Sequence, residues 1–485
     1  MSKILYVSSE AFPLVKTGGL ADVAGSLPPA LLKKSQDVRL LLPAYPEVLN
    51  KIRHRKVRSA SSYYNLDLEI IETRLPGSKV IAWLVDCPAL FDRPGGPYAD
   101  EHGQEWQDNA LRFAVFCHAA VDISLNKLQL DWQPDIVHCN DWQTGLVPAL
   151  LSLQAERPVT VFTIHNLAYQ GVFGQHTFAD LHLPAELWHI DGLEFHDQLS
   201  FIKGGLAYAD IITTVSPRYA IEILQPEFGC GLEGLLKKRA ADLTGILNGI
   251  DEKLWNPGSD NYLKQKYNRL SLNKKSVNKT ELQKELSLPV DAAIPMIGMI
   301  GRLVEQKGLE IFIQSLPGLL SLPVQIVILG SGEHNYESQL TKWAQKRANR
   351  LKIIIGYDES LAHRIEAACD IYLMPSTFEP CGLNQLYSLR YGTLPIVTYV
   401  GGLADTVTDA TEENIDNGKA NGFVLQYHTK VSLITAVLRA LAIYQKPDIW
   451  RQLQINAMSG DFSWENSAEH YIRLYQEAID TKSFP

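Results

Sequence analysis

Cysteine is scarce in this sequence and is not arranged for disulfides or metal ions. The 485 residues include six cysteines, which are Cys87, Cys117, Cys139, Cys230, Cys369 and Cys381. They form no CxxC pair and no Cys/His spacing typical of a zinc site. Scattered thiols are typical of a reducing compartment, where disulfides do not persist. We therefore expect reduced cysteines in a cytosolic protein.

A long apolar run and an excess of basic residues are also missing. No apolar stretch approaches the roughly 18 residues that a membrane-spanning helix needs. The first strand-like run begins at Ile4, which leaves no room for a signal or transit peptide. The formal net charge is -9, whereas a nucleic-acid-binding protein needs a basic face. These absences predict a cytoplasmic protein with no membrane or nucleic-acid partner, although a few cations suffice for one phosphate pocket.

What the chain does contain is an alternation of strand-like and helix-like segments. The chain is too long to fold around one compact core, so two or three domains are expected. In the first half the strand-like runs are 4–7, 37–43, 79–85, 135–141, 159–166 and 211–216, and 109–128 carries a helical pattern. This alternation predicts a parallel sheet with helices on both faces. Ligands bind at the carboxyl ends of such strands, where His138, Asn140, Asp141, His165 and Asn166 fall.

The character of the sequence changes near residue 250. A loop-like stretch leads into a polar run, rich in Lys, Asn and Ser, that continues to Lys284. A second series of strand-like runs follows at 295–300, 325–329, 352–355, 371–374 and 395–398, and 464–480 has the pattern of a last helix. We predict one domain over 1–250, a second over 251–460, and a C-terminal helix within 461–485.

The first candidate site lies just after the first strand-like run. Lys16-Thr17-Gly18-Gly19-Leu20 leads into a helical pattern that continues through Leu31. A strand, a Gly-Gly loop and a helix N-terminus bring backbone N–H groups together, and the glycines let a ligand approach the backbone closely. The motif predicts an anion site with Lys16 beside it. A simple strand–helix turn with a solvated lysine is the alternative.

Stronger signals lie in the second half. Arg302 and Lys307 stand in one loop directly after the run 295–300, at a spacing that can clamp both phosphates of a diphosphate. A solvated surface loop is the alternative. Glu379 lies in Phe-Glu-Pro-Cys-Gly-Leu at 378–383, before a helix start. A carboxylate and free amides there suit sugar hydroxyls and phosphate, although Glu379 could simply stabilise the helix N-terminus.

These motifs, taken in order, resemble those of bacterial glycogen synthases and plant starch synthases. The matching segments are 16–20 with Asp22, His-x-Asn-Asp-Trp at 138–142, Thr-x-His-Asn at 163–166, Asn-Gly-x-Asp at 248–251, Gly-Arg…Lys-Gly at 301–308, 378–383, and Gly-Gly-Leu-Ala-Asp-Thr at 401–406. The resemblance implies the GT-B architecture. This is an α/β fold of two doubly wound, Rossmann-like domains facing across a cleft, with a C-terminal helix crossing back to the first domain. The absence of a long N-terminal extension favours a bacterial, ADP-glucose-dependent glycogen synthase.

The resemblance also implies roles for residues. Arg302 and Lys307 would stabilise the departing diphosphate, and Glu379, His165 and Asp141 would complete the catalytic set. His165 would lie beside the transferred glucose, while Asp141 would orient the acceptor or a neighbouring loop; a core imidazole and a structural carboxylate are the alternatives. The implied donor-binding residues are Lys16, Gly18, Gly19, Asp22, Asn248, Tyr357, Cys381, Gly382, Leu383, Gly401, Gly402 and Thr406. A packed ring at Tyr357 and a tight Asn-Gly turn at Asn248 are equally compatible with the sequence.

The implied reaction is retaining transfer of glucose from ADP-glucose to the nonreducing 4-hydroxyl of an α-1,4-glucan, which elongates glycogen and releases ADP. No metal or other cofactor is implied. Many relatives of this fold carry a second glutamate near the position of Gln385, so glutamine there argues against a two-carboxylate mechanism. A front-face mechanism is then preferred, in which the donor phosphate helps to deprotonate the acceptor. The rival functions are a nucleotide-sugar transferase with a small acceptor and a non-catalytic glucan or nucleotide sensor.

Overall fold

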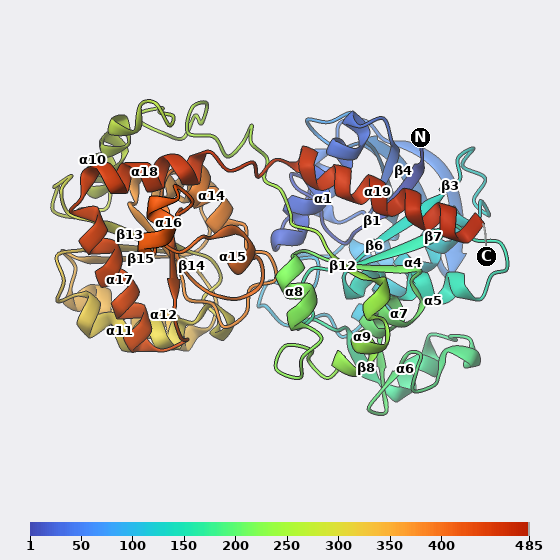
Figure 1. The fold of residues 1–485 in the computed structure, drawn as a ribbon. Coiled ribbons are helices and arrows are strands. Elements are labelled where there is room, and N and C mark those ends of the chain that lie inside the picture. The colour runs from blue at the N-terminus through green and yellow to red at the C-terminus, as the bar shows by residue number, and fades with distance from the viewer. Residues whose placement is uncertain (484–485) are drawn as a thin grey trace. The chain divides into compact units, whose positions relative to one another are not determined.

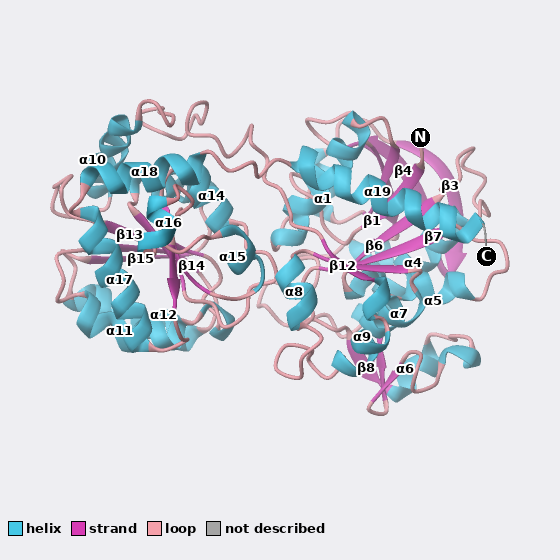
Figure 2. Ribbon diagram, viewed as in Figure 1, coloured by secondary structure: helices cyan, strands magenta, loops and turns pink. Residues whose placement is uncertain are grey.

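The computed structural model describes residues 1–483, and the chain divides into two compact units (Figure 1). Unit 1 comprises residues 1–249 together with the segment from Trp464 onward, and unit 2 comprises Ile250–Ser463. Each unit is built on a central sheet covered by helices (Figure 2). In the described part of the chain, no helix combines the length and the apolar character needed to cross a membrane.

The sheet of unit 1 has nine strands in the order β12-β11-β7-β6-β1-β2-β5-β4-β3. Their bounds are β1 Lys3–Val7, β2 Asp37–Pro43, β3 Lys56–Tyr63, β4 Leu66–Arg74, β5 Ile81–Asp86, β6 Ile136–Asn140, β7 Val159–Ile164, β11 Ile211–Thr214 and β12 Leu243–Gly245. Neighbours from β12 to β5 are parallel. Since β1 is followed by β2 on one side and paired with β6 on the other, the topological switch point lies between β1 and β6.

One edge of this sheet carries two strands that the sequence does not predict. β3 and β4 form a hairpin, and β4 pairs with β5 in the antiparallel sense. The turn residues Tyr64 and Asn65 both have positive φ, at 53° and 61°, as the tight turns of two-residue hairpins require. Neither residue is glycine, so the usual sequence signal of such a turn is missing. The strands that the sequence predicts in this half are parallel to one another, whereas β3 and β4 are missed.

Helices cover both faces of the unit 1 sheet. They are α1 Gly19–Lys33, α2 Pro46–Lys51, α3 Pro88–Phe91, α4 Asn109–Ser124, α5 Leu146–Ser152, α6 Gln175–Asp180, α7 Phe201–Tyr208, α8 Pro217–Glu222, α9 Glu233–Lys238 and α19 Trp464–Ser483. A small antiparallel sheet of β8 Val172–Gly174, β9 Glu194–Phe195 and β10 Gln198–Ser200 lies beyond them. α1 buries Leu20, Val23, Leu27 and Leu31 in the core, as its helical spacing predicts.

The last helix, α19, packs against α1 within unit 1 (Figure 1). Its apolar face buries Ala468, Tyr471, Tyr475 and Ala478. On its outer side Glu465 pairs with Lys33 of α1 at 2.7 Å, a partly exposed contact of the kind that contributes little. The buried face therefore accounts for the attachment of α19.

Unit 2 contains a six-stranded, wholly parallel sheet in the order β15-β14-β13-β16-β17-β18. Its strands are β13 Met296–Ile300, β14 Gln325–Gly330, β15 Leu351–Ile355, β16 Ile371–Met374, β17 Leu394–Thr398 and β18 Phe423–Leu425. The helices are α10 Lys275–Glu285, α11 Leu309–Leu319, α12 His334–Lys346, α13 Glu359–Ala368, α14 Asn384–Arg390, α15 Gly401–Thr406, α16 Glu412–Asp416, α17 Lys430–Tyr444 and α18 Pro447–Met458. The switch point of this sheet lies between β13 and β16.

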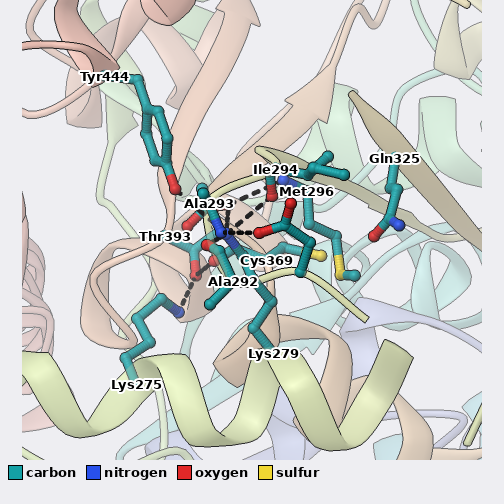
Figure 3. Close-up of polar contacts among 12 residues, drawn as sticks. Lys275, Lys279, Ala292, Ala293, Ile294, Met296, Gln325, Cys369, Thr393 and Tyr444 are labelled. Atoms are coloured by element: carbon teal, nitrogen blue, oxygen red, sulfur yellow. Dashed lines mark hydrogen bonds and ion pairs between the residues drawn. The ribbon is translucent and has the colours of Figure 1, made fainter. Parts of the chain in front are cut away.

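The polar run before β13 contains a helix with buried lysines. Lys275 and Lys279 of α10 are 5% and 1% exposed, and Figure 3 shows both pointing from the helix into one polar cluster. Lys279 pairs with Asp370 at 2.6 Å, while Lys275 donates to Thr393 Oγ1 at 2.7 Å and to backbone carbonyls at the end of α13. Burial lowers the pKa of Lys275 to about 8. Composition alone gives no sign that these lysines belong to the interior.

Candidate active site

The carboxyl ends of β1, β6 and β7 bring together three polar side chains of unit 1. Asn140 Oδ1 accepts hydrogen bonds from Tyr6 OH at 3.0 Å and from His165 Nε2 at 2.9 Å, while its Nδ2 donates to Val7 O at 2.9 Å. His165 must carry its proton on Nε2, because an amide oxygen can only accept. Burial lowers the pKa of His165 to about 3. The imidazole is therefore neutral and fixed in one tautomer.

Asp141 directly follows β6 and is held in a strained conformation. Its φ is 56°, a region that non-glycine residues visit rarely and often at functional sites. The carboxylate accepts the backbone N–H of His165 at 2.7 Å and that of Asn166 at 3.4 Å. Burial nevertheless raises the pKa of Asp141 to about 7. The structure thus brings Asp141, His165 and Asn166 together, as their positions at strand ends predict.

His138 lies one layer deeper and connects this edge to α19. Its Nδ1 is 2.6 Å from Tyr475 OH, and its Nε2 is 2.6 Å from Thr163 Oγ1. The side chain is fully buried, and burial lowers its pKa to about 3. We therefore assign His138 to the support of the sheet edge, not to ligand contact.

The Lys16–Leu20 loop differs from the open anion site that the sequence predicts. Lys16 Nζ is paired with Asp22 at 2.9 Å, and Gly18 is the extended N-cap residue of α1. The backbone N–H groups of Thr17 and Gly18 already donate to the carboxylate of Glu10, at 2.5 and 3.1 Å. Sequence reasoning misses Glu10, although it stands just after the end of β1, where ligand-contacting residues of such sheets gather.

Asn248 follows β12 in unit 1 and presents an unusual acceptor. The side chain is 7% exposed. Within residues 1–483 its Oδ1 is buried and has no hydrogen-bond partner. Since buried polar atoms are almost always paired, this oxygen is suited to accept a hydrogen bond from a ligand hydroxyl.

In unit 2, Lys307 and Glu379 meet at the carboxyl ends of β13 and β16. Lys307 Nζ lies 2.6 Å from Glu379 Oε2, which also accepts Ser376 Oγ at 3.0 Å. Glu379 is 6% exposed. The turn carrying Lys307 is tightly packed, because a Cβ on Gly308 would lie 1.8 Å from Pro375 O and its φ is +68°. The sequence predicts a cation for phosphate here, and the structure adds that a buried carboxylate holds it.

Arg302 follows β13 closely and is exposed. It lines a small cavity together with Gly301, Lys307 and Ser376. This cavity sits at the switch point of the unit 2 sheet, where ligands of open α/β sheets bind. Arg302, Lys307 and Glu379 are thus gathered at one place within unit 2.

The turns at 379–383 and 401–406 are pressed against each other. Gly402 N donates to Glu379 O at 3.2 Å, and a Cβ on Gly402 would lie 2.0 Å from Cys381 O. Gln385 is fully buried, and its Nε2 donates to Cys381 O and Gly382 O at 2.9 and 3.0 Å. Its amide therefore supports the turn that carries the Cys381, Gly382 and Leu383 positions. Thr406 Oγ1 donates back to Gly402 O at 2.6 Å.

Tyr357 lies at the end of another strand of unit 2. It follows β15 at the edge of the unit 2 sheet and is 66% exposed, so the packed ring allowed by the sequence is wrong. Among residues 1–483, no three His, Cys, Asp or Glu side chains gather as metal ligands would.

Comparison with known proteins assigns the chain that carries these sites to a family. Residues 3–238 match the profile of the family described as "Starch synthase catalytic domain", and residues 279–453 match "Glycosyl transferases group 1". The chain is 54% identical to glycogen synthase 1 of Methylococcus capsulatus over 480 residues, covering 98% of this chain and 97% of that protein. It is 55% identical to the glycogen synthase of Cellvibrio japonicus over 477 residues, covering 98% and 99%. The chain belongs to the glycogen synthase family.

The structural comparison agrees with this placement. The catalytic domain of starch synthase IV from Arabidopsis thaliana, bound to ADP and acarbose, superposes with a TM-score of 0.90 at 32% identity and 99% coverage of both chains. A sucrose-phosphate synthase from Thermosynechococcus elongatus, at 16% identity and a TM-score of 0.60, shares the fold. Like other members of the glycogen synthase family, this chain is a glycosyltransferase with two α/β domains of the GT-B type.

Proposed function

We propose that this protein is an ADP-glucose:α-1,4-glucan 4-α-glucosyltransferase that elongates glycogen in the cytoplasm with retention of configuration. The observation that carries the proposal is the grouping of Arg302, Lys307 and Glu379 at the switch point of the unit 2 sheet. A solved structure also supports the proposal: the starch synthase IV domain, which is 32% identical to this chain, binds ADP. Free cysteines throughout the described chain suit the cytoplasm.

In unit 2 the chemical task is to stabilise charge on the leaving diphosphate. Cleavage of the sugar–phosphate bond places negative charge on the β-phosphate, and preorganised cations lower that barrier most effectively. Arg302 offers a planar fork of donors, and Lys307 offers a compact charge whose position is fixed by Glu379. Glu379 thus acts on the leaving group through Lys307, and its other oxygen is available to the sugar.

The second carboxylate of a double-displacement mechanism is lacking at Gln385. Both carbonyl oxygens that receive its Nε2 are pure acceptors, and a glutamate there would repel them. We therefore prefer front-face transfer, in which the donor phosphate receives the proton of the attacking 4-hydroxyl. The turns around Gly382 and Gly402, with Cys381, Leu383, Gly401 and Thr406, shape the donor pocket.

Unit 1 provides the sugar-binding groups. Asn248 Oδ1, which has no partner among residues 1–483, suits a glucose hydroxyl. Lys16, which is paired with Asp22, suits the donor phosphates, together with Gly18 and Gly19. His165 is neutral and half-buried beside Asn140, which suits a position next to the transferred glucose. Asp141 holds the loop that carries His165 and orients the acceptor. Tyr357, exposed at the end of β15, stacks on the base.

The test offers radiolabelled ADP-glucose with glycogen, with maltooligosaccharides or with a small sugar phosphate. Label should enter only the glucans, in linkages that α-amylase cleaves, and excess unlabelled UDP-glucose should compete poorly. Arg302→Ala should remove incorporation, whereas the exposed control Arg451→Ala on α18 should not. Label in the small acceptor alone would instead establish the rival transferase, and no transfer in a preparation that binds ADP would favour a sensor.

A further inference from the structure

Glu10 occupies the anion-binding turn of the Lys16–Leu20 loop. The residue follows β1 and is 3% exposed. One carboxylate oxygen accepts the backbone N–H groups of Thr17 and Gly18, at 2.5 and 3.1 Å, and the other accepts Tyr98 OH at 2.9 Å. A turn with two converging N–H groups attracts an anion, and here the chain itself supplies that anion. An external phosphate cannot use these two donors while Glu10 holds them.

The second carboxylate oxygen of Glu10 is also held in place, because its partner Tyr98 has further contacts. Tyr98 OH also contacts Ser9 Oγ at 2.7 Å, and its backbone oxygen accepts Asn109 Nδ2 at 3.0 Å. The segment before it is anchored by Arg112, which is fully buried and donates to Pro97 O at 2.9 Å. Glu10 therefore links the loop before α1 to a second loop, whose Tyr98 packs against the unit 1 core. Burial raises the pKa of Glu10, and the three hydrogen bonds oppose that rise.

We propose that Glu10 is a positioning residue for the donor: it fixes the backbone at Thr17 and Gly18 so that Lys16 is presented in one orientation. The inference rests on the proposed function, because only then does Lys16 face a nucleotide sugar. The proposal assigns different roles to the side chain of Lys16 and to the backbone amides of the loop, which the sequence motif alone does not separate. The loop contributes the Lys16 side chain and the start of α1, whereas the amides of Thr17 and Gly18 serve the internal carboxylate.

The kinetic test compares Glu10→Ala with Glu10→Gln. The glutamine oxygen can still accept both backbone N–H groups, and its Nε2 can donate to Tyr98 OH. We expect Glu10→Gln to remain within about threefold of wild type in kcat/KM for ADP-glucose. Glu10→Ala should fall by about 100-fold, the loss expected for a misplacement of about 1 Å, with the KM for glycogen unchanged. Equal losses in the two variants, or no loss in Glu10→Ala, would overturn the proposal.

A second readout is independent of turnover. Hydrogen exchange at the amides of Thr17 and Gly18 should be faster in Glu10→Ala than in wild type or in Glu10→Gln; unchanged protection would refute the assignment. The matched control is Asp210→Ala, which removes a carboxylate bonded to the backbone N–H of Thr160 in the same unit. It should lower the melting temperature and leave kcat/KM unchanged. If Glu10→Ala does not fold, Glu10→Asp, which keeps the charge but not the reach, takes its place with the same expected acceleration.

An inactive wild-type protein whose Thr17 and Gly18 amides are protected by Glu10 would refute the proposed function and the donor role of Glu10 while leaving the contact intact. An active protein whose Glu10→Ala variant turns over normally would refute the inference alone. The two failures are therefore distinguishable.

Discussion

Replacing Asp141 by asparagine should stabilise the protein at alkaline pH while impairing its reaction. In the Asp141→Asn variant, the amide oxygen would still accept the backbone N–H of His165, as the carboxylate does now at 2.7 Å. The backbone at this position, with φ 56° and ψ −179°, already carries a non-glycine residue, and asparagine has nearly the same shape as aspartate. The substitution thus removes a buried charge with little change in shape.

The magnitude follows from the pKa of the group. Burial raises the pKa of Asp141 from 3.8 to about 7, so the folded state binds a proton that the unfolded state has lost between these values. Below pH 3.8 both states are protonated and the group has no effect. As the pH rises through this window the native state loses stability. Above about pH 7 the loss is complete, at about 4 kcal/mol, because each pKa unit corresponds to about 1.36 kcal/mol. The Asp141→Asn variant has no such cost.

Native-state hydrogen exchange of amides in β6 and β7 measures the local unfolding free energy in both proteins. The stability advantage of Asp141→Asn over wild type should grow between pH 3.8 and about pH 7 and stay constant, at about 4 kcal/mol, above that pH. Its kcat/KM for glucan should nevertheless fall at least tenfold if the carboxylate orients the acceptor. A stability difference that does not change with pH would refute the argument from burial, and normal turnover would reduce Asp141 to a structural carboxylate.

Four further substitutions, two of them combined in a double variant, test unit 2. Arg302→Ala should lower kcat by about 10²–10³, the typical loss of one charge-stabilising donor, with glucan affinity within twofold in a binding assay. Lys307→Ala should lower kcat and also destabilise unit 2 by about 3–5 kcal/mol, because it leaves the buried Glu379 carboxylate unpaired; adding Glu379→Gln should restore the melting temperature but not the rate. Gln385→Glu should raise the KM for ADP-glucose and lower the melting temperature, since a carboxylate would face two carbonyl oxygens. An unperturbed Gln385→Glu enzyme would exclude the support that we assign to that amide.

The sequence predicts much of this site because strand ends are easy to locate. β6 and β7 are continuous buried strands, and the polar residues that follow them, Asp141 and His165, necessarily share one edge of a parallel sheet. Contacts between segments far apart in the chain cannot be predicted in this way. Glu10 and Tyr98 are separated by 88 residues, and nothing in either local pattern points to the other.

The burial of charged side chains is equally hard to predict from the sequence. The lysines of α10 look like a solvated linker, since composition cannot reveal that Asp370 and backbone carbonyls surround them. The β3–β4 hairpin escapes prediction for a related reason, because its turn uses Tyr64 and Asn65 in place of glycine. In each case a tertiary contact or an unusual turn residue overrides the local signal.

The two copies of Gly-Gly-Leu-Ala-Asp show how one motif can have two physical causes. In the copy at 401–405, the first glycine has φ +43° and a Cβ on it would lie 1.9 Å from Glu379 O. In the copy at 18–22, Gly18 is extended at φ −151°, a conformation open to any residue, and a Cβ there would meet nothing within 4 Å. Internal packing therefore requires glycine at 401 but not at 18.

This contrast yields a prediction for matched substitutions. Gly401→Ala should lower the melting temperature, because the added methyl group collides with backbone that cannot move aside. Gly18→Ala should leave the melting temperature unchanged and raise the KM for ADP-glucose, because only an approaching donor would meet the new methyl group. Calorimetric titration with ADP separates the nucleotide from the sugar: an unchanged ADP affinity with a raised KM places the glucose there. If Gly18→Ala alters neither the KM nor ADP affinity, no donor approaches the backbone at Gly18, and the close approach inferred from the motif is wrong.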